Sequence, residues 1–206
     1  MDTFLDVQEA KTRLITEMAS VTGFKYLKRG ALKTSIKDIV IEIEFHSSHW
    51  NFSGESIEVM ADLRVVYKKF GKLPSSAYNI VAGTGYTAEE GYWYNITTEE
   101  KLNEVSKILG QRLKETAVDL ANRFEEDYEG AIKYLFYEGY EKYKVSLDFV
   151  ADTLGQDIIK DKVKEICDGL TDEDKEEIAR YRNGARDKVW MLNRCDLKYI
   201  VDNNLV

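Results

Sequence analysis

Proline, cysteine and histidine are scarce in this sequence, and long apolar runs are missing. Its 206 residues include one proline, Pro74, two cysteines and two histidines. Linkers of the Pro-rich or Gly/Ser-rich kind are therefore excluded. No stretch approaches the roughly 20 apolar residues that span a bilayer, and the charged N-terminal residues do not resemble a signal peptide. We expect a soluble cytoplasmic protein without a membrane partner.

The two cysteines, Cys167 and Cys195, lie far apart and form no CxxC pair. In a chain without a secretion signal, this spacing is typical of two reduced thiols rather than a disulfide framework. No sequence motif indicates a bound metal or another cofactor, so we predict neither.

Apolar and acidic residues are plentiful. Hydrophobic residues make up 44% of the chain and aromatic residues 12%, enough for a folded core. Residues 1–96 hold 11 basic and 12 acidic side chains, whereas residues 97–206 hold 18 and 25, a net charge of −7. This excess repels nucleic acid, which we do not expect as a partner, and it fits a basic protein partner.

The hydrophobic period changes along the first half. Residues 3–21 have the spacing of an amphipathic helix that stops at Gly23. Residues 38–46 and 55–68 then alternate apolar and polar, which predicts two antiparallel strands joined by a loop of about eight residues. Glu42 and Glu44 fall on the face that the alternation predicts to be solvated.

Weaker strand patterns occur at 24–36, 78–82 and 91–96, followed by a long helical stripe over 97–125. Thr97 with Glu100 three residues later predicts a capping box at the start of that helix. The fold class is thus predicted to be α+β. Four or five antiparallel strands form a meander, and two helices cover it.

The last third of the chain is predicted to be helical throughout. An aromatic-rich segment spans 128–150, a helix follows at 156–167, and Thr171 with Asp174 starts the next one. A final helix is expected to carry Val189, Trp190 and Leu192. We predict an α+β core domain at 1–125 and a helical extension at 126–206 packed on that core.

The loop between the two strongest strands is the candidate site. It holds both histidines of the chain, together with hydroxyls, an indole and an amide. Such side chains serve recognition well on a loop held by two firm strands. The predicted binding residues are His46, Ser48, His49, Trp50 and Asn51.

Chemistry at the same loop is the alternative. A metal-dependent enzyme would need His46 and His49 to converge with carboxylates such as Glu44 or Asp62, which no spacing nominates. A hydrolase would use a serine with a histidine base, but the segment has no glycine-flanked nucleophile elbow. Without a complete constellation, no catalytic residue is predicted.

Residues 1–125 resemble a bacterial family of unknown function. The matching features are the first helix ending in Gly23-Phe24, the strand at 41–45, the Ser-Ser-His-Trp-Asn loop at 47–51, the alternating strand after it and the helix at 97–125. The resemblance implies a helix-flanked antiparallel sheet in a small cytoplasmic bacterial protein, without an established activity.

Residues and resemblance together favour a non-enzymatic protein-binding or regulatory protein, of the kind that confers immunity by masking a basic partner. The alternatives are the loop-centred hydrolase or metal-dependent enzyme and a homo-oligomeric scaffold.

Overall fold

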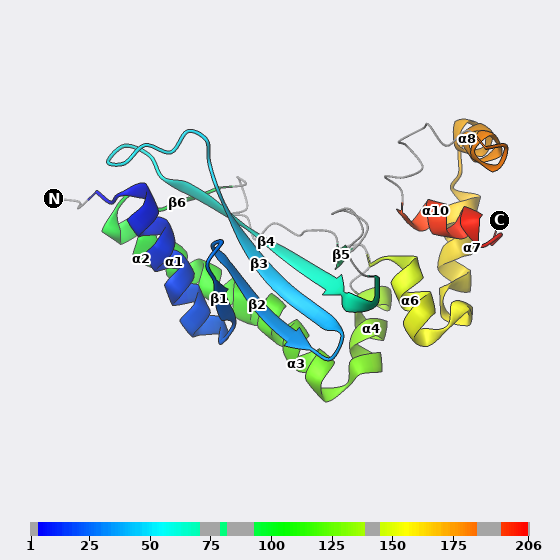
Figure 1. The fold of residues 1–206 in the computed structure, drawn as a ribbon, viewed down its shortest axis with the longest axis horizontal. Helices are drawn as coiled ribbons and strands as arrows, with labels where there is room; N and C mark the ends of the chain where they lie inside the picture. The colour runs from blue at the N-terminus through cyan, green and yellow to red at the C-terminus, as the bar shows by residue number, and fades with distance from the viewer. Residues whose placement is uncertain (1–3, 71–78, 82–92, 139–144, 185–194, 206) are drawn as a thin grey trace.

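The computed structural model describes residues 4–70, 79–81, 93–138, 145–184 and 195–205 (Figure 1). It is an α+β structure in which one antiparallel sheet carries helices and is followed by a helical C-terminal part. The elements are α1 (Val7–Thr22), β1 (Lys25–Leu27), β2 (Ala31–Ile36), β3 (Ile39–Ser47), β4 (Glu58–Tyr67), the 3₁₀ turn η1 (Lys68–Phe70), β5 (Asn79–Val81), β6 (Tyr94–Asn95), α2 (Glu99–Leu113), the π-helical turn η2 (Lys114–Val118), α3 (Asp119–Glu126), α4 (Tyr128–Tyr137), α6 (Leu147–Leu154), the 3₁₀ turn η3 (Gln156–Ile159), α7 (Lys160–Asp168), α8 (Asp172–Arg182) and α10 (Cys195–Asp202).

The sheet is the predicted meander with one short addition. Its strands follow the order β1-β2-β3-β4-β5, each antiparallel to the next, and the two-residue β6 also pairs with β4. The register of β3 and β4 runs from Ile39 opposite Tyr67 to Ser47 opposite Val59. The apolar residues of both alternating strands therefore share one buried face, as predicted.

Helices α1, α2 and α3 cover that face of the sheet (Figure 1). Asp6 caps α1 by accepting from the backbone N–H groups of Gln8 and Glu9, and Gly23 ends it with a φ of 72°. Val21 of α1 lies beside Gly110 of α2, where an added Cβ would stand 3.4 Å from a Val21 methyl carbon. Glycine at this position lets the two helices approach closely.

The predicted N-cap of the long helix is wrong by one residue. Thr98 is the cap, and its side chain accepts from the N–H of Lys101. Thr97 is buried instead. Its Oγ1 accepts from the N–H of Ile57 at 2.9 Å and donates to Asn95 Oδ1 at 2.7 Å. Thr97 therefore hydrogen-bonds to the segment before β4, and Thr98 caps α2.

We expect Thr97→Val to destabilise the protein by about 1–3 kcal/mol, because it leaves the buried Ile57 N–H without its acceptor. Thr97→Ser keeps the hydroxyl and should cost much less. Urea denaturation of both variants measures the difference. Equal losses for valine and serine would contradict this account, because serine keeps the hydroxyl that accepts from Ile57 and valine does not.

The C-terminal part is a series of short helices. Thr171 and Asp174 form the predicted capping box of α8, and Asn183-Gly184 end that helix, with a φ of 93° at Gly184. The predicted helix around Val189, Trp190 and Leu192 lies outside the described residues. Within the described part of the chain, no helix is long and apolar enough to cross a membrane.

The helical part meets the sheet where β4 ends. Tyr67 donates to Asp152 Oδ2 at 2.8 Å, and its ring meets that of Phe149 edge-on with centroids 5.0 Å apart. Tyr128 donates to Asp38 Oδ1 at 2.6 Å. One hydrophobic cluster includes sheet residues and buried residues of α4, α6 and α7. Helices α4 and α6 therefore contact this end of the sheet, whereas buried residues of α8 and α10 form a second hydrophobic cluster. The division of the chain at residue 125 stays a prediction.

Asp152 should make this contact sensitive to acid. Lys69 Nζ donates to both of its oxygens at 2.6 and 2.7 Å, and this bond, followed by that from Tyr67, holds the pKa of the Asp152 carboxyl below its usual value. Since the pKa is lower in the folded state, the stabilisation is present above the unfolded pKa of about 3.9 and is lost as the pH falls through the folded pKa.

We expect the wild type to lose more stability than Asp152→Asn between about pH 5 and pH 2, because the amide does not titrate. Urea denaturation at a series of pH values measures both slopes. Parallel curves for the two proteins would mean that Asp152 carries none of the acid dependence.

Candidate functional site in the loop between β3 and β4

The loop joining β3 to β4 is tied down by its own polar groups. It spans residues 48–57, two more than predicted. Asn51 Nδ2 donates to the Glu58 carbonyl and Asn51 Oδ1 accepts from the Glu58 N–H, both at 2.9 Å. The amide thus replaces a neighbouring strand at the start of β4. Phe52 N–H donates to the Ser56 carbonyl at 2.8 Å and closes the tip.

The tip is also fastened to the start of α1. Ser53 Oγ donates to Asp6 Oδ2 at 2.9 Å and accepts from the N–H of Val7 at 3.2 Å, while Gly54 N–H donates to the carbonyl of Leu5 at 3.3 Å. The hydrogen bond from Ser53 is the largest cause that lowers the pKa of the Asp6 carboxyl. One carboxylate therefore caps the helix and holds the loop, which fixes the loop on the body of the protein.

Large aromatic side chains are exposed at this end of the molecule. Trp50 is 79% exposed, Phe52 59%, and Phe4 57%. Phe4 is fixed by its bridge to Thr98 and precedes Leu5, which binds Gly54. Figure 1 shows the N-terminal segment, this loop and the start of α2 at the same end. We call Phe4, Trp50 and Phe52 the aromatic tip.

Carboxylates occur on the three segments that meet at the aromatic tip. They are Asp6 and Glu9 at the start of α1, Glu55 and Glu58 in the loop and at its end, and Glu99 and Glu100 at the start of α2. Arg13 meets this group: its two Nη atoms donate to Glu99 at 2.5 and 2.6 Å, which lowers the pKa of the Glu99 carboxyl. We call these six side chains the acidic rim.

The structure assigns different positions to the predicted binding residues. His49 and Trp50 are exposed on the turn, and Ser48 Oγ accepts from the Trp50 N–H at 3.2 Å. Asn51 is turned to the backbone of β4. His46 lies on β3, on the sheet face away from α1 and α2. A ligand at the loop can therefore reach His49 and Trp50 directly, whereas Asn51 braces the loop.

His46 belongs to a network of charged side chains on the polar sheet face. Its Nε2 lies 3.2 Å from Asp62 Oδ2 and 4.0 Å from Glu44 Oε2, and Arg64 Nη1 lies 2.7 Å from Glu44 Oε1. Arg29 binds Glu42, whose residue is only 6% exposed. The prediction that Glu42 is solvated was therefore wrong, because the Arg29 side chain from the β1–β2 turn reaches across to it.

The positions of these side chains can be compared with the two enzymatic alternatives, a metal site and a serine–histidine pair. Within the described residues, no group of three or more His, Cys, Asp or Glu side chains is arranged to hold a metal ion. Ser48 Oγ and the His46 imidazole each contact groups other than one another. Asp62, named from the sequence as a possible partner of His46, does lie beside it. Arg64, which binds Glu44, was missed, although the β3–β4 register that places Glu44 opposite Asp62 also places Glu42 opposite Arg64.

Comparison with protein-family models, curated proteins and solved structures finds no match to this chain. The resemblance of residues 1–125 to a bacterial family therefore stays a prediction. Function must be inferred from the geometry of the loop and its surroundings.

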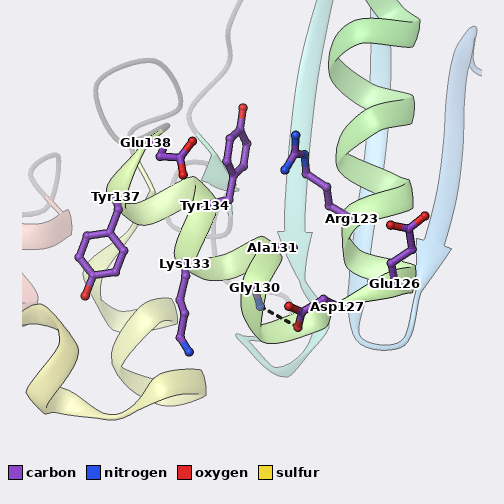
Figure 2. A pocket seen from close by; sticks show the side chains of 9 residues that line it. All are labelled: Arg123, Glu126, Asp127, Gly130, Ala131, Lys133, Tyr134, Tyr137 and Glu138. Carbon is purple, nitrogen blue, oxygen red and sulfur yellow. Dashed lines mark hydrogen bonds between the residues drawn. The ribbon is translucent and has the colours of Figure 1, made fainter.

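A cavity of about 380 Å³ lies between α3 and α4, away from the loop (Figure 2). Figure 2 shows Arg123 of α3 pointing towards Tyr134 of α4, and the guanidinium carbon lies 4.1 Å from the ring centroid. Arg123 Nε also donates to Asp119 at 2.7 Å, and Asp127 accepts from the N–H of Gly130 at 2.9 Å. Arg123 and Asp127 thus already have partners within the protein, and the cavity gives no indication of a particular ligand.

Proposed function

We propose that this protein binds a basic protein partner through the aromatic tip and acts by masking that partner, as an immunity-type or regulatory protein does. The observation that carries the proposal is the exposed Trp50 on a loop held at both ends. Asn51 fixes the loop to β4, and Ser53 fixes it to Asp6.

The aromatic tip has the composition of an interface centre. Tryptophan is enriched among the residues that dominate binding free energy, because its large ring loses much water on burial. A braced loop also loses little conformational entropy when it binds. Exposed rings grouped at one end of a protein are typical of a surface that contacts another molecule.

The acidic rim indicates the charge of the partner. Two of its members, Glu55 in the loop and Glu100 at the start of α2, have exposed side chains. The whole chain has the same sign, with a formal net charge of −8. Basic groups around a pocket for Trp50 would match this pattern, and electrostatic attraction would speed association at low salt.

The test is copurification from the native host in low salt, followed by a wash at about 0.5 M NaCl, where charges are screened within a few ångströms. We expect a basic protein that leaves in the wash and that does not copurify with Trp50→Ala. Recovery of the monomer alone, or of a partner insensitive to both changes, would contradict the proposal. Light scattering on the purified chain identifies self-association, the scaffold alternative.

A further inference from the structure

A second cavity, of about 560 Å³, lies at the opposite end of the molecule from the aromatic tip. It is formed by η3, by one face of α7 and by the segment after α10. Its volume is within the range of about 300–1,000 Å³ that is usual for small-molecule sites. The proposed protein-binding function does not use it.

The floor of this cavity is apolar. Ile159 and Val163 are buried, and the Cys167 thiol adds to the same wall. Burial, and then the nearby Asp168 carboxylate, raises the pKa of the Cys167 thiol, so the sulfur is neutral at physiological pH. Leu205 closes the other side, held by its N–H bond to the Ile200 carbonyl at 2.9 Å. A ligand here needs an apolar body.

The rim of the cavity carries two ammonium groups. Lys160 and Lys164 are one helical turn apart on the face of α7 that lines the cavity. Lys160 Nζ lies 2.6 Å from Asp157, and Lys164 binds Asp168, with both pairs exposed to solvent. Exposed ion pairs contribute little free energy, so either lysine can turn to an anionic group at the rim at low cost.

We propose that this cavity binds a small amphipathic anion, an unbranched alkyl chain that ends in one carboxylate, as in a medium-chain fatty acid. The alkyl chain lies on Ile159, Val163 and Leu205, and the carboxylate lies between Lys160 and Lys164. The apolar floor sets the length of the chain, and the two lysines set the sign of the head group.

Isothermal titration calorimetry with sodium decanoate, below its micelle concentration, tests the proposal. Decyltrimethylammonium has the same chain and the opposite charge, and we expect it to bind at least about tenfold more weakly. Octanoate should bind more weakly than decanoate by roughly threefold to fourfold for each missing methylene group. Equal affinity for the two head groups, or no dependence on chain length, would overturn the assignment.

Variants locate the binding. Combined Lys160→Gln and Lys164→Gln substitutions should weaken decanoate binding about tenfold. Lys175→Gln is the matched control, because Lys175 forms a similar exposed pair with Asp172 on α8. In a Cys195→Ser background, decanoate should also slow alkylation of Cys167 by N-ethylmaleimide. Unchanged alkylation, or equal losses in the lysine variants and the control, would exclude this cavity as the site.

Discussion

Trp50→Ala is expected to weaken binding of the partner by at least about 30-fold, the loss typical of a residue that dominates an interface. Trp50 is 79% exposed in the free chain, and its removal deletes the largest ring of the aromatic tip without opening a core cavity. Calorimetry with the copurified partner measures the change in affinity. Thermal denaturation should show a stability within about 0.5 kcal/mol of the wild type.

Tyr137→Ala is the matched control for Trp50→Ala. Tyr137 is also a strongly exposed aromatic residue, but it lies on α4, away from the loop. We expect no change in partner affinity for this variant. Equal effects of the two substitutions would mean that general surface hydrophobicity, and not the aromatic tip, drives the association.

Asn51→Ala tests whether the rigidity of the loop contributes to affinity separately from the contacts made by the aromatic tip. It removes both hydrogen bonds to Glu58 and leaves the three rings of the aromatic tip intact. If the braced loop matters, affinity falls because the loop must be ordered on binding. An affinity equal to the wild type would show that pre-organisation by Asn51 contributes nothing.

Phe149→Ala is expected to destabilise the protein by about 3–5 kcal/mol, the largest stability effect predicted here. Phe149 is completely buried in α6 and packs edge-on against Tyr67 of β4, so its loss leaves a cavity between the helical part and the sheet. Because buried residues of the sheet, α4, α6 and α7 belong to one hydrophobic cluster, the loss should appear in a single unfolding transition of these elements.

Urea denaturation monitored by far-UV circular dichroism measures this loss, and scanning calorimetry shows the number of thermal transitions. Ile108→Ala, a change at an exposed apolar residue of α2, is the control and should cost less than about 0.5 kcal/mol. A second transition in Phe149→Ala, with the first unchanged, would show that the helical part unfolds on its own and contributes little to the sheet.

Much of the fold was predictable because its signals are local. Alternation in 38–46 and 55–68 requires only a strand with one buried face, and Gly23 supplies the positive φ that ends α1. The π-helical turn η2 has no such signal, because the apolar stripe passes through it at helical spacing. Thr97 and Thr98 are equally suited to capping, so the pairing of Ile96 with Ile57 had to decide between them.

The position of the loop between β3 and β4 was predictable from the sequence, but the hydrogen bonds that hold it were not. Turn residues and exposed recognition side chains located the loop, whereas the bonds that brace it join residues far apart in sequence, such as Asp6 and Ser53. Glu42 was misjudged for the same reason. Alternation places it on the polar face, but only the folded β1–β2 turn brings Arg29 over it.

Photo-crosslinking at the aromatic tip tests the central claim most directly. A benzoyl-phenylalanine in place of Phe52, in cells of the native host, should capture one basic protein, and the same group in place of Tyr137 should not. The crosslink is covalent, so the captured pair survives denaturing purification and mass spectrometry should identify it. Capture of the same proteins from both positions, or of none from position 52, would contradict the assignment of the aromatic tip as the binding surface.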